Sequence, residues 1–447
     1  MRFVVQKAEL NFESSQQLLS TASLLNSSTS VNYLKAHFFE TIASLGQIII
    51  VDESYQLEQL KLLCLADDVV VVYFHEAPLN DLSCRVLMHS MGSLMICGGF
   101  MHKWTFGKSV CNVVTSQIQA QNLKTRLGDA APIMCVFPPK LNTNLFRLPS
   151  ETEVWNAKAH FSVSANEFHI VYAGRLIANK GISQVVRALN IFKEHVSLRI
   201  TIVGDFETDF YINQSHCYNT TFPHFFEREV ISHNIHCSIQ RLPSMRHEQL
   251  RQLFWSADCF VYASFHEDEN FGITPREAML CGVPVVATDF CGLGALKDAK
   301  CEILKTYPTL AGIRFSVKEL AEKIYRIWNR DLFESRNDKK FNSIWVQEEC
   351  NVIASEQLLK LAVNNLLDIP VSLPPVGGWR SKERFDNWMA KAPVAFKQAV
   401  ANHGKAVPDG LFVDGTGNTE CEWFSEPYFM KAIQGLYLDS TNKCNVL

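Results

Sequence analysis

Two glutamates, Glu269 and Glu277, flank a short turn, and carboxylates in such a place could exchange protons with a ligand or bind one. The apolar run at residues 260–264 predicts a buried strand before them, and Pro275 favours the first turn of a helix after Gly272. Ligands of open α/β sheets bind beyond the carboxyl ends of strands, where such loops lie. We therefore expect both carboxylates to serve one ligand from opposite sides of one turn.

A second motif joins a predicted strand to a predicted helix through Gly174-Arg175 and Lys180-Gly181. Cations at the start of a helix oppose its dipole, so Arg175 and Lys180 are badly placed for helix stability. The same side chains are well placed to hold an anion between them. Ordinary solvated surface charge is the alternative interpretation of this pair.

The elements that must position these residues form an α/β pattern. A chain of 447 residues exceeds what one core usually organises, so we expect two domains. Short β-rich runs alternate with helical patterns, which is typical of parallel sheets covered by helices. The predicted strands are residues 3–5, 47–51, 69–74, 94–97 and 113–115, then 169–173, 198–203, 236–241, 259–262 and 284–287. The predicted helices of the second half are residues 181–194, 247–256, 275–281 and 317–328.

The boundaries of the domains follow from breaks in this pattern. Two adjacent prolines and a polar segment predict a first domain over residues 1–148 and a linker over residues 149–166. The second domain is expected over residues 167–340. Residues 341–367 predict a helix that packs back toward the first domain, and residues 368–447 form a tail to which the sequence assigns no role.

Composition narrows the class of protein. The chain is 47% hydrophobic and 20% charged, and its net charge of -4 provides no global field for a polyanion, so we expect no nucleic-acid partner. The 14 cysteines form no C-x-x-C pair and indicate buried thiols in a reducing compartment. We find neither a signal peptide nor an apolar run long enough for a membrane span. We therefore expect a cytoplasmic protein. A peripheral membrane contact through residues 85–106 is compatible with the sequence, but the apolar residues there fit an ordinary core helix and strand of the first domain better.

The first motif resembles a known family in its whole context. Phe-Gly follows Glu269 closely, and Ala-Met-x-x-Gly-x-Pro-Val-Val-Ala follows Glu277. This pattern, together with Gly174-Arg175 and Lys180-Gly181, is similar to the retaining family-four glycosyltransferases, the group 1 type, of the GT-B fold. The resemblance implies an α/β fold of two Rossmann-like domains facing a cleft. It also implies transfer of a hexose from a nucleoside diphosphate sugar, UDP- or GDP-linked, with retention of anomeric configuration.

The resemblance also implies roles for matching residues. Glu269 would bind hydroxyls of the transferred sugar, and Glu277 would bind the ribose hydroxyls, which suits ionised carboxylates. Two fixed cations, Arg175 and Lys180, would clamp the diphosphate, so we expect neither a metal ion nor another cofactor. The catalytic residues implied are Glu269, His102, Arg175 and Lys180, and the donor-binding residues implied are Gly174, Arg175, Lys180, Asn270, Phe271, Gly272, Ile273, Thr274 and Glu277.

The first domain matches the family less well. The run ending in His102 resembles a family strand whose histidine lies near the transferred sugar, and His75 ends a similar run. A structural or solvated histidine is an equally good interpretation of His102. The glycine-rich turn expected after the first strand is replaced by residues 6–11, Gln-Lys-Ala-Glu-Leu-Asn. Recognition of the acceptor therefore stays open among carbohydrate, lipid-linked and small-molecule compounds.

Other functions compete with this one. A glycoside hydrolase is disfavoured because Glu269 and Glu277 would serve one ligand from one turn and not flank a glycosidic bond. A sugar-nucleotide epimerase of the same fold, and a non-catalytic binding or scaffold protein, remain as alternatives. Glu267 and Asp268 are explained by the dipole of the following helix, and the flanking sequence argues against a metal-binding acidic triplet.

Overall fold

The computed structural model describes residues 1–6, 30–51, 68–73, 85–90, 110–121, 133–192, 197–206, 226–227, 230, 237–266, 269–309, 312–330 and 332–368. These residues divide into two compact units. Unit 1 contains Met1–Lys140 and resumes at Cys350, and unit 2 spans Leu141–Glu349. Each unit is described below by itself.

Unit 1 is built on a parallel six-stranded sheet with the order β2-β1-β3-β4-β5-β6. Its strands are β1 (Arg2–Gln6), β2 (Gln47–Val51), β3 (Asp68–Tyr73), β4 (Arg85–Ser90), β5 (Val110–Val114) and β6 (Ile133–Val136). Helices α2 (Ser30–Leu45) and α13 (Val352–Asp368) contribute Phe38, Phe39 and Leu359 to one core with the strands. Val69, Val70 and Val71 of β3 are buried, as strands covered on both faces require.

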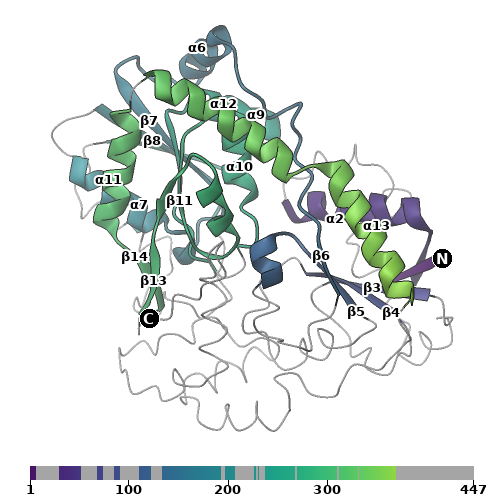
Figure 1. Ribbon diagram of the computed structural model, residues 1–447. Helices are drawn as coiled ribbons and strands as arrows, with labels where there is room; N and C mark the ends of the chain where they lie inside the picture. The colour runs from purple at the N-terminus through teal and green to yellow at the C-terminus, as the bar shows by residue number, and fades with distance from the viewer. Residues whose placement is uncertain are drawn as a thin grey trace. The chain divides into compact units, whose positions relative to one another are not determined.

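Unit 2 repeats this architecture with the strand order β12-β11-β10-β7-β8-β9, again parallel throughout. Its strands are β7 (Glu167–Ala173), β8 (Ser197–Val203), β9 (Ser238–Leu242), β10 (Cys259–Tyr262), β11 (Val285–Thr288) and β12 (Glu302–Leu304). Its helices are α6 (Glu151–His160), α7 (Ile182–Leu189), α9 (His247–Ser256), α10 (Ile273–Leu280), α11 (Val317–Trp328) and α12 (Leu332–Glu349) (Figure 1). Short 3-10 turns η5 (Ala178–Lys180), η6 (Asn190–Phe192) and η8 (Cys291–Asp298), and a hairpin of β13 (Thr306–Thr309) and β14 (Gly312–Phe315), complete it.

The expected α/β class with two Rossmann-like units is confirmed, and five strands, β4, β6, β12, β13 and β14, were not predicted from the sequence. The strand expected at residues 94–97 lies outside the described residues. Strand β4 was overlooked because it begins and ends with polar residues. Arg85 uses its guanidinium to bind the carbonyls of Leu366 and Leu367 at 3.1 and 2.7 Å, which satisfies the C-terminal end of α13.

Residues 149–166, the segment expected to link the domains, contain helix α6. Ser150 caps it, because its hydroxyl accepts from the Glu153 amide while the Glu153 carboxylate accepts from the Ser150 amide at 2.8 Å. The helix packs against α9 within unit 2. The polar composition taken for a linker is that of an exposed, capped helix.

The helix expected over residues 341–367 is two helices. Helix α12 ends at Glu349 in unit 2, and α13 begins at Val352 in unit 1, where it packs on β4, β5 and β6. Asn351 starts the second helix, since its side-chain oxygen accepts from the Ala354 amide at 3.1 Å. No helix in the described ranges is both long and apolar enough to cross a membrane.

Candidate active site

The two sequence motifs meet at one edge of the sheet of unit 2. Strands β7 and β10 are parallel neighbours, and the motifs follow their carboxyl ends. Gly181 lies between η5 and α7 with a φ of 75°, and a β-carbon there would collide with the carbonyl oxygen of Ala263 in the loop after β10. Glycine at this position therefore permits the close approach of the two loops.

Lys180 and Glu269 form a buried ion pair at this edge. Each side chain is only 8% exposed, and the Lys180 ammonium contacts the Glu269 carboxylate directly. The Tyr262 hydroxyl donates to the same carboxylate oxygen at 2.9 Å and lies 3.3 Å from the Lys180 ammonium. Lys180, Tyr262 and Glu269 are called here the carboxyl-end cluster, in which the first two side chains bind the Glu269 carboxylate.

The charges of this cluster fix the state of Glu269 and of the neighbouring His266. Burial raises the pKa of Glu269, but the Lys180 ammonium and the hydrogen bonds outweigh burial and lower it overall. Burial, followed by the charges of Lys180 and Arg175, lowers the pKa of His266 well below its ordinary value. Glu269 is therefore an ionised acceptor, and His266 is a neutral imidazole.

Arg175 stands beside the cluster and is exposed. Its guanidinium lies 3.5 Å from the Nε2 atom of His266, and its carbonyl accepts from the Tyr172 hydroxyl at 2.9 Å. The Gly174 amide donates to Val203 at 3.0 Å, which ties the turn to β8. An exposed cation, Arg175, thus lies next to the buried ion pair of the carboxyl-end cluster.

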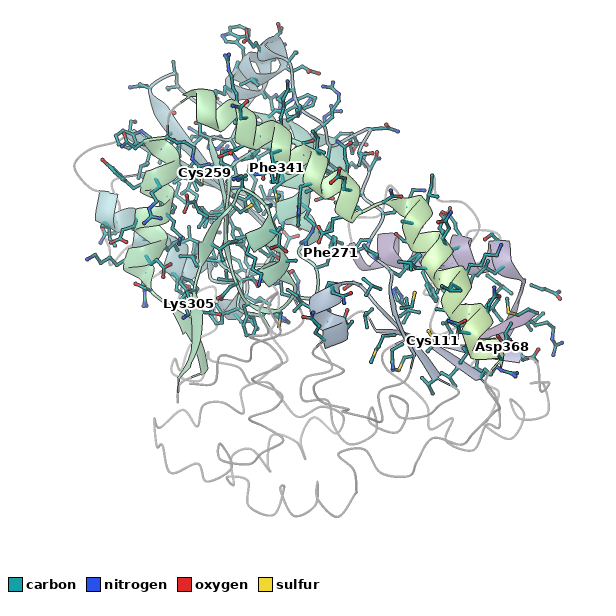
Figure 2. All side chains as sticks on the ribbon, viewed as in Figure 1. Cys111, Cys259, Phe271, Lys305, Phe341 and Asp368 are labelled. Carbon is teal, nitrogen blue, oxygen red and sulfur yellow. The ribbon has the colours of Figure 1, made fainter. Side chains whose placement is uncertain are left out.

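The turn between Glu269 and α10 is tightly packed. Gly272 has a φ of 74° and precedes the helix, while Asn270 and Phe271 are buried and Ile273 and Thr274 are half-buried. Figure 2 marks the position of Phe271. The Gly292 amide donates to the Glu269 carbonyl at 2.7 Å, and a β-carbon on Gly292 would collide with Asn270. Packing against η8 leaves this turn little freedom to move.

Glu277 differs from Glu269 in having no visible partner. It lies in α10 and is 6% exposed, and its carboxylate makes no ion pair or side-chain hydrogen bond with any residue that the structure describes. Burial raises the pKa of Glu277 to about 8. A buried carboxyl without donors is unfavourable, so a ligand that brings hydroxyl groups would satisfy it.

The structure thus brings most of the expected residues together and adds others. His102 and His75 lie outside the described residues. Tyr262 and His266 were not singled out from the sequence, although their place at the end of β10 was a signal for them. Within the described ranges, no group of three or more His, Cys, Asp or Glu side chains is arranged to hold a metal ion.

Comparison with known proteins finds a family model that matches most of unit 2. The family model described as "Glycosyl transferases group 1" matches residues 154–339. D-inositol 3-phosphate glycosyltransferase of Paenarthrobacter aurescens (strain TC1) is 30% identical over 200 residues, which cover 43% of this chain and 44% of that protein. The phosphatidylinositol N-acetylglucosaminyltransferase GPI3 subunit of Saccharomyces cerevisiae (strain YJM789) is 24% identical over 213 residues, 47% of this chain and 41% of that one. The chain spans less than half the length of these relatives.

Solved structures share the fold over most of the chain. Sucrose-phosphate synthase from Thermosynechococcus elongatus is 17% identical with a TM-score of 0.56, over 82% of this chain and 99% of that one. Anabaena Alr3699/HepE in complex with UDP is also 17% identical, with a TM-score of 0.55 over 81% and 99%. Such low identity establishes the fold alone. Residues 154–339 of the chain thus match the group 1 glycosyltransferase model, and its two parallel-sheet units have the GT-B fold.

Proposed function

We propose that this protein transfers a hexose from a nucleoside diphosphate sugar to an acceptor hydroxyl, with retention of anomeric configuration and without a metal ion. The observation that carries the proposal is the carboxyl-end cluster, with Arg175 exposed beside it and Glu277 buried without a visible partner. A nucleotide sugar offers a diphosphate for cations and vicinal hydroxyls for carboxylates.

Each part of such a donor has a counterpart in the cluster. Arg175 and Lys180 would bind the diphosphate, and the Lys180 ammonium retains one of its three N–H donors after contacting Glu269 and Tyr262. Glu277 would accept from the ribose hydroxyls and Glu269 from those of the sugar. In the reaction, the two cations would stabilise the charge that develops on the departing diphosphate.

Retention is supported by the state of Glu269. Its lowered pKa and its two donors suit it to accepting hydrogen bonds rather than to carrying a proton. We propose that the leaving phosphate oxygen takes the acceptor proton. The bond between the anomeric carbon and the diphosphate breaks, and the new bond to the acceptor oxygen forms on the same face.

We propose a uridine donor first. The Anabaena HepE structures that share this fold hold UDP and UDP-glucose, and an Escherichia coli neighbour holds UDP-2-fluoro glucose. The names of the two curated relatives mention inositol compounds, but they match this chain over less than half their length. The acceptor is therefore proposed only as a hydroxyl compound, to be sought among carbohydrate, lipid-linked and small molecules.

The test is a thermal-shift panel of UDP, GDP and ADP, followed by incubation with donor sugars. A ligand present at one hundred times its Kd should stabilise the folded chain by about 2.7 kcal/mol, which is a rise of several degrees in Tm. No shift with any nucleotide would contradict a donor site. Incubation without acceptor separates the alternatives, since an epimerase would convert the sugar and a transferase would give only slow hydrolysis.

A further inference from the structure

Arg276 is a buried cation that the proposed donor chemistry does not use. It lies in the first turn of α10 and is 0% exposed. A positive charge there opposes the helix dipole, and its burial is costly unless partners surround it. The arginine therefore calls for an explanation other than contact with a ligand.

The Arg276 guanidinium binds the backbone of the donor turn from inside. Its Nη1 atom donates to the carbonyls of Phe271 and, at 3.3 Å, Gly272. Pro275 stands four residues after Phe271 and has no N–H, so the helix cannot supply a donor to that carbonyl. The guanidinium carbon also lies 3.8 Å from the centroid of the Phe271 ring. Arg276 thus holds both the backbone and the side chain of Phe271.

Glu349 holds the arginine in turn. Its two carboxylate oxygens accept from Nε and Nη2 of Arg276 at 2.5 and 2.7 Å, which is the bidentate geometry that fixes a guanidinium in orientation. Glu349 is the last residue of α12, the next residue, Cys350, is assigned to unit 1, and α12 packs on α10. The pair therefore ties the donor turn to the point at which the chain enters unit 1.

The hydrogen bonds of Arg276 determine where two amides point. A carbonyl and the following N–H share one planar trans peptide and point in opposite directions. Arg276 draws the carbonyls of Phe271 and Gly272 inward. The N–H groups of Gly272 and Ile273 are consequently turned away from the core, and these two residues are among those that the resemblance implies for donor binding.

We infer that Arg276 and Glu349 are positioning residues for donor binding, an inference that rests on the proposed function. They act through the peptide planes of the donor turn and do not touch the ligand. If the pair served stability alone, replacing it would leave nucleotide binding unchanged. Replacing a buried ion pair by apolar side chains of similar volume is often neutral or stabilising, so such a variant can be tested in the folded state.

The experiment compares R276M/E349L with a matched pair elsewhere. Arg2 and Asp68 form a similar bidentate pair in unit 1, at 2.9 and 2.6 Å, and R2M/D68L removes it. Tm is measured for each variant, and the Kd is measured by calorimetry for whichever of UDP, GDP and ADP binds the wild type. We expect R276M/E349L to fold with a Tm a few degrees below that of the wild type, because the carbonyls of Phe271 and Gly272 lose this donor, and to bind about tenfold more weakly, a loss of about 1.4 kcal/mol. R2M/D68L should bind as the wild type does.

The outcomes separate the two proposals. If the wild-type chain binds none of the three nucleotides, the proposed function fails. If the wild type binds and R276M/E349L binds equally well, the positioning role is overturned, and it is equally overturned if that variant does not fold. R276K keeps the charge but loses the planar fork, so we expect weaker binding than in the wild type, and wild-type affinity in R276K would also contradict the inference.

Discussion

The two ends of the strands in unit 2 carry similar side chains in different states. At the amino end, Lys158 contacts Asp258 at 2.8 Å, and Asp258 accepts from the His169 amide at 2.9 Å. Both ring nitrogens of His169 have partners, the Ser256 carbonyl at 3.0 Å and the Thr201 hydroxyl at 2.8 Å. This amino-end cluster satisfies its own polar groups and is explained by structure alone.

The carboxyl end uses similar residue types but has polar groups that are not all satisfied by the residues that the structure describes. Lys180 and Glu269 are more deeply buried than Lys158 and Asp258, an exposed cation stands beside them, and Glu277 is buried without a visible partner. Residue type therefore does not separate a structural cluster from a site. The unsatisfied hydrogen-bonding capacity does, because a ligand can supply what the protein lacks.

The largest expected effect comes from exchanging the lysines of the two clusters for methionine. K180M removes a cation from the departing diphosphate, and we expect kcat/KM for transfer to fall by about 10³. K158M should leave kcat/KM within about twofold and lower the free energy of unfolding by about 1 kcal/mol or less, since its partner Asp258 is partly exposed. Equal activity in the two variants would remove the distinction between the ends.

Glu277 should show opposite effects on binding and on stability. At pH 9, where the wild type offers a Glu277 carboxylate, E277Q should weaken nucleotide binding by about tenfold or more, because an amide oxygen accepts from hydroxyls less strongly than a carboxylate. The folded chain holds the Glu277 proton up to a pKa of about 8, whereas the unfolded chain releases it near 4.5. Stability of the wild type therefore falls as pH rises between these values, and E277Q should lack that part of the fall.

Urea unfolding at pH 5 and pH 9 measures this difference. Between pH 5 and pH 9, we expect the free energy of unfolding of E277Q to rise by about 1–3 kcal/mol relative to that of the wild type. D258N is the control, because Asp258 has partners in the folded chain. If the difference in free energy of unfolding between E277Q and the wild type does not change with pH, Glu277 is not held neutral in the folded chain.

Tyr262 should have a smaller effect. Y262F removes the hydroxyl that donates to Glu269 at 2.9 Å, while Lys180 continues to hold the carboxylate. We expect kcat/KM to fall about fivefold, which corresponds to one hydrogen bond of about 1 kcal/mol. Y172F changes the neighbouring tyrosine, which contacts the Arg175 carbonyl, and a larger loss in Y172F than in Y262F would argue against the assigned role.

His169 should have the smallest effect on activity. Burial lowers its pKa to about 4, below the 6.5 of an unfolded chain. The stability that it contributes is therefore present above pH 6.5 and is lost as pH falls toward 4. H169Q should reduce this acid sensitivity in thermal melts, with nucleotide affinity unchanged, and a change in affinity would show that the amino-end cluster affects the site.

Much of unit 2 was predictable because its elements are strongly patterned. Helices α9 and α11 and strand β10 have the predicted bounds, and the motifs located both loops of the site. The pairing of Lys180 with Glu269 was not predicted, nor was the contact of Arg276 with Glu349, 73 residues away. Such contacts depend on how helices pack on the sheet, which local periodicity does not specify. Helix α6 was missed because an exposed helix has a composition similar to that of a linker.

The most direct test of the donor site is calorimetric titration of UDP into the wild type, E277Q and D258N at pH 9. We predict one binding site on the wild type, the same affinity in D258N, and binding at least tenfold weaker in E277Q. Equal affinity in E277Q and the wild type, or a loss confined to D258N, would contradict the assignment of the donor site to the carboxyl ends of the strands.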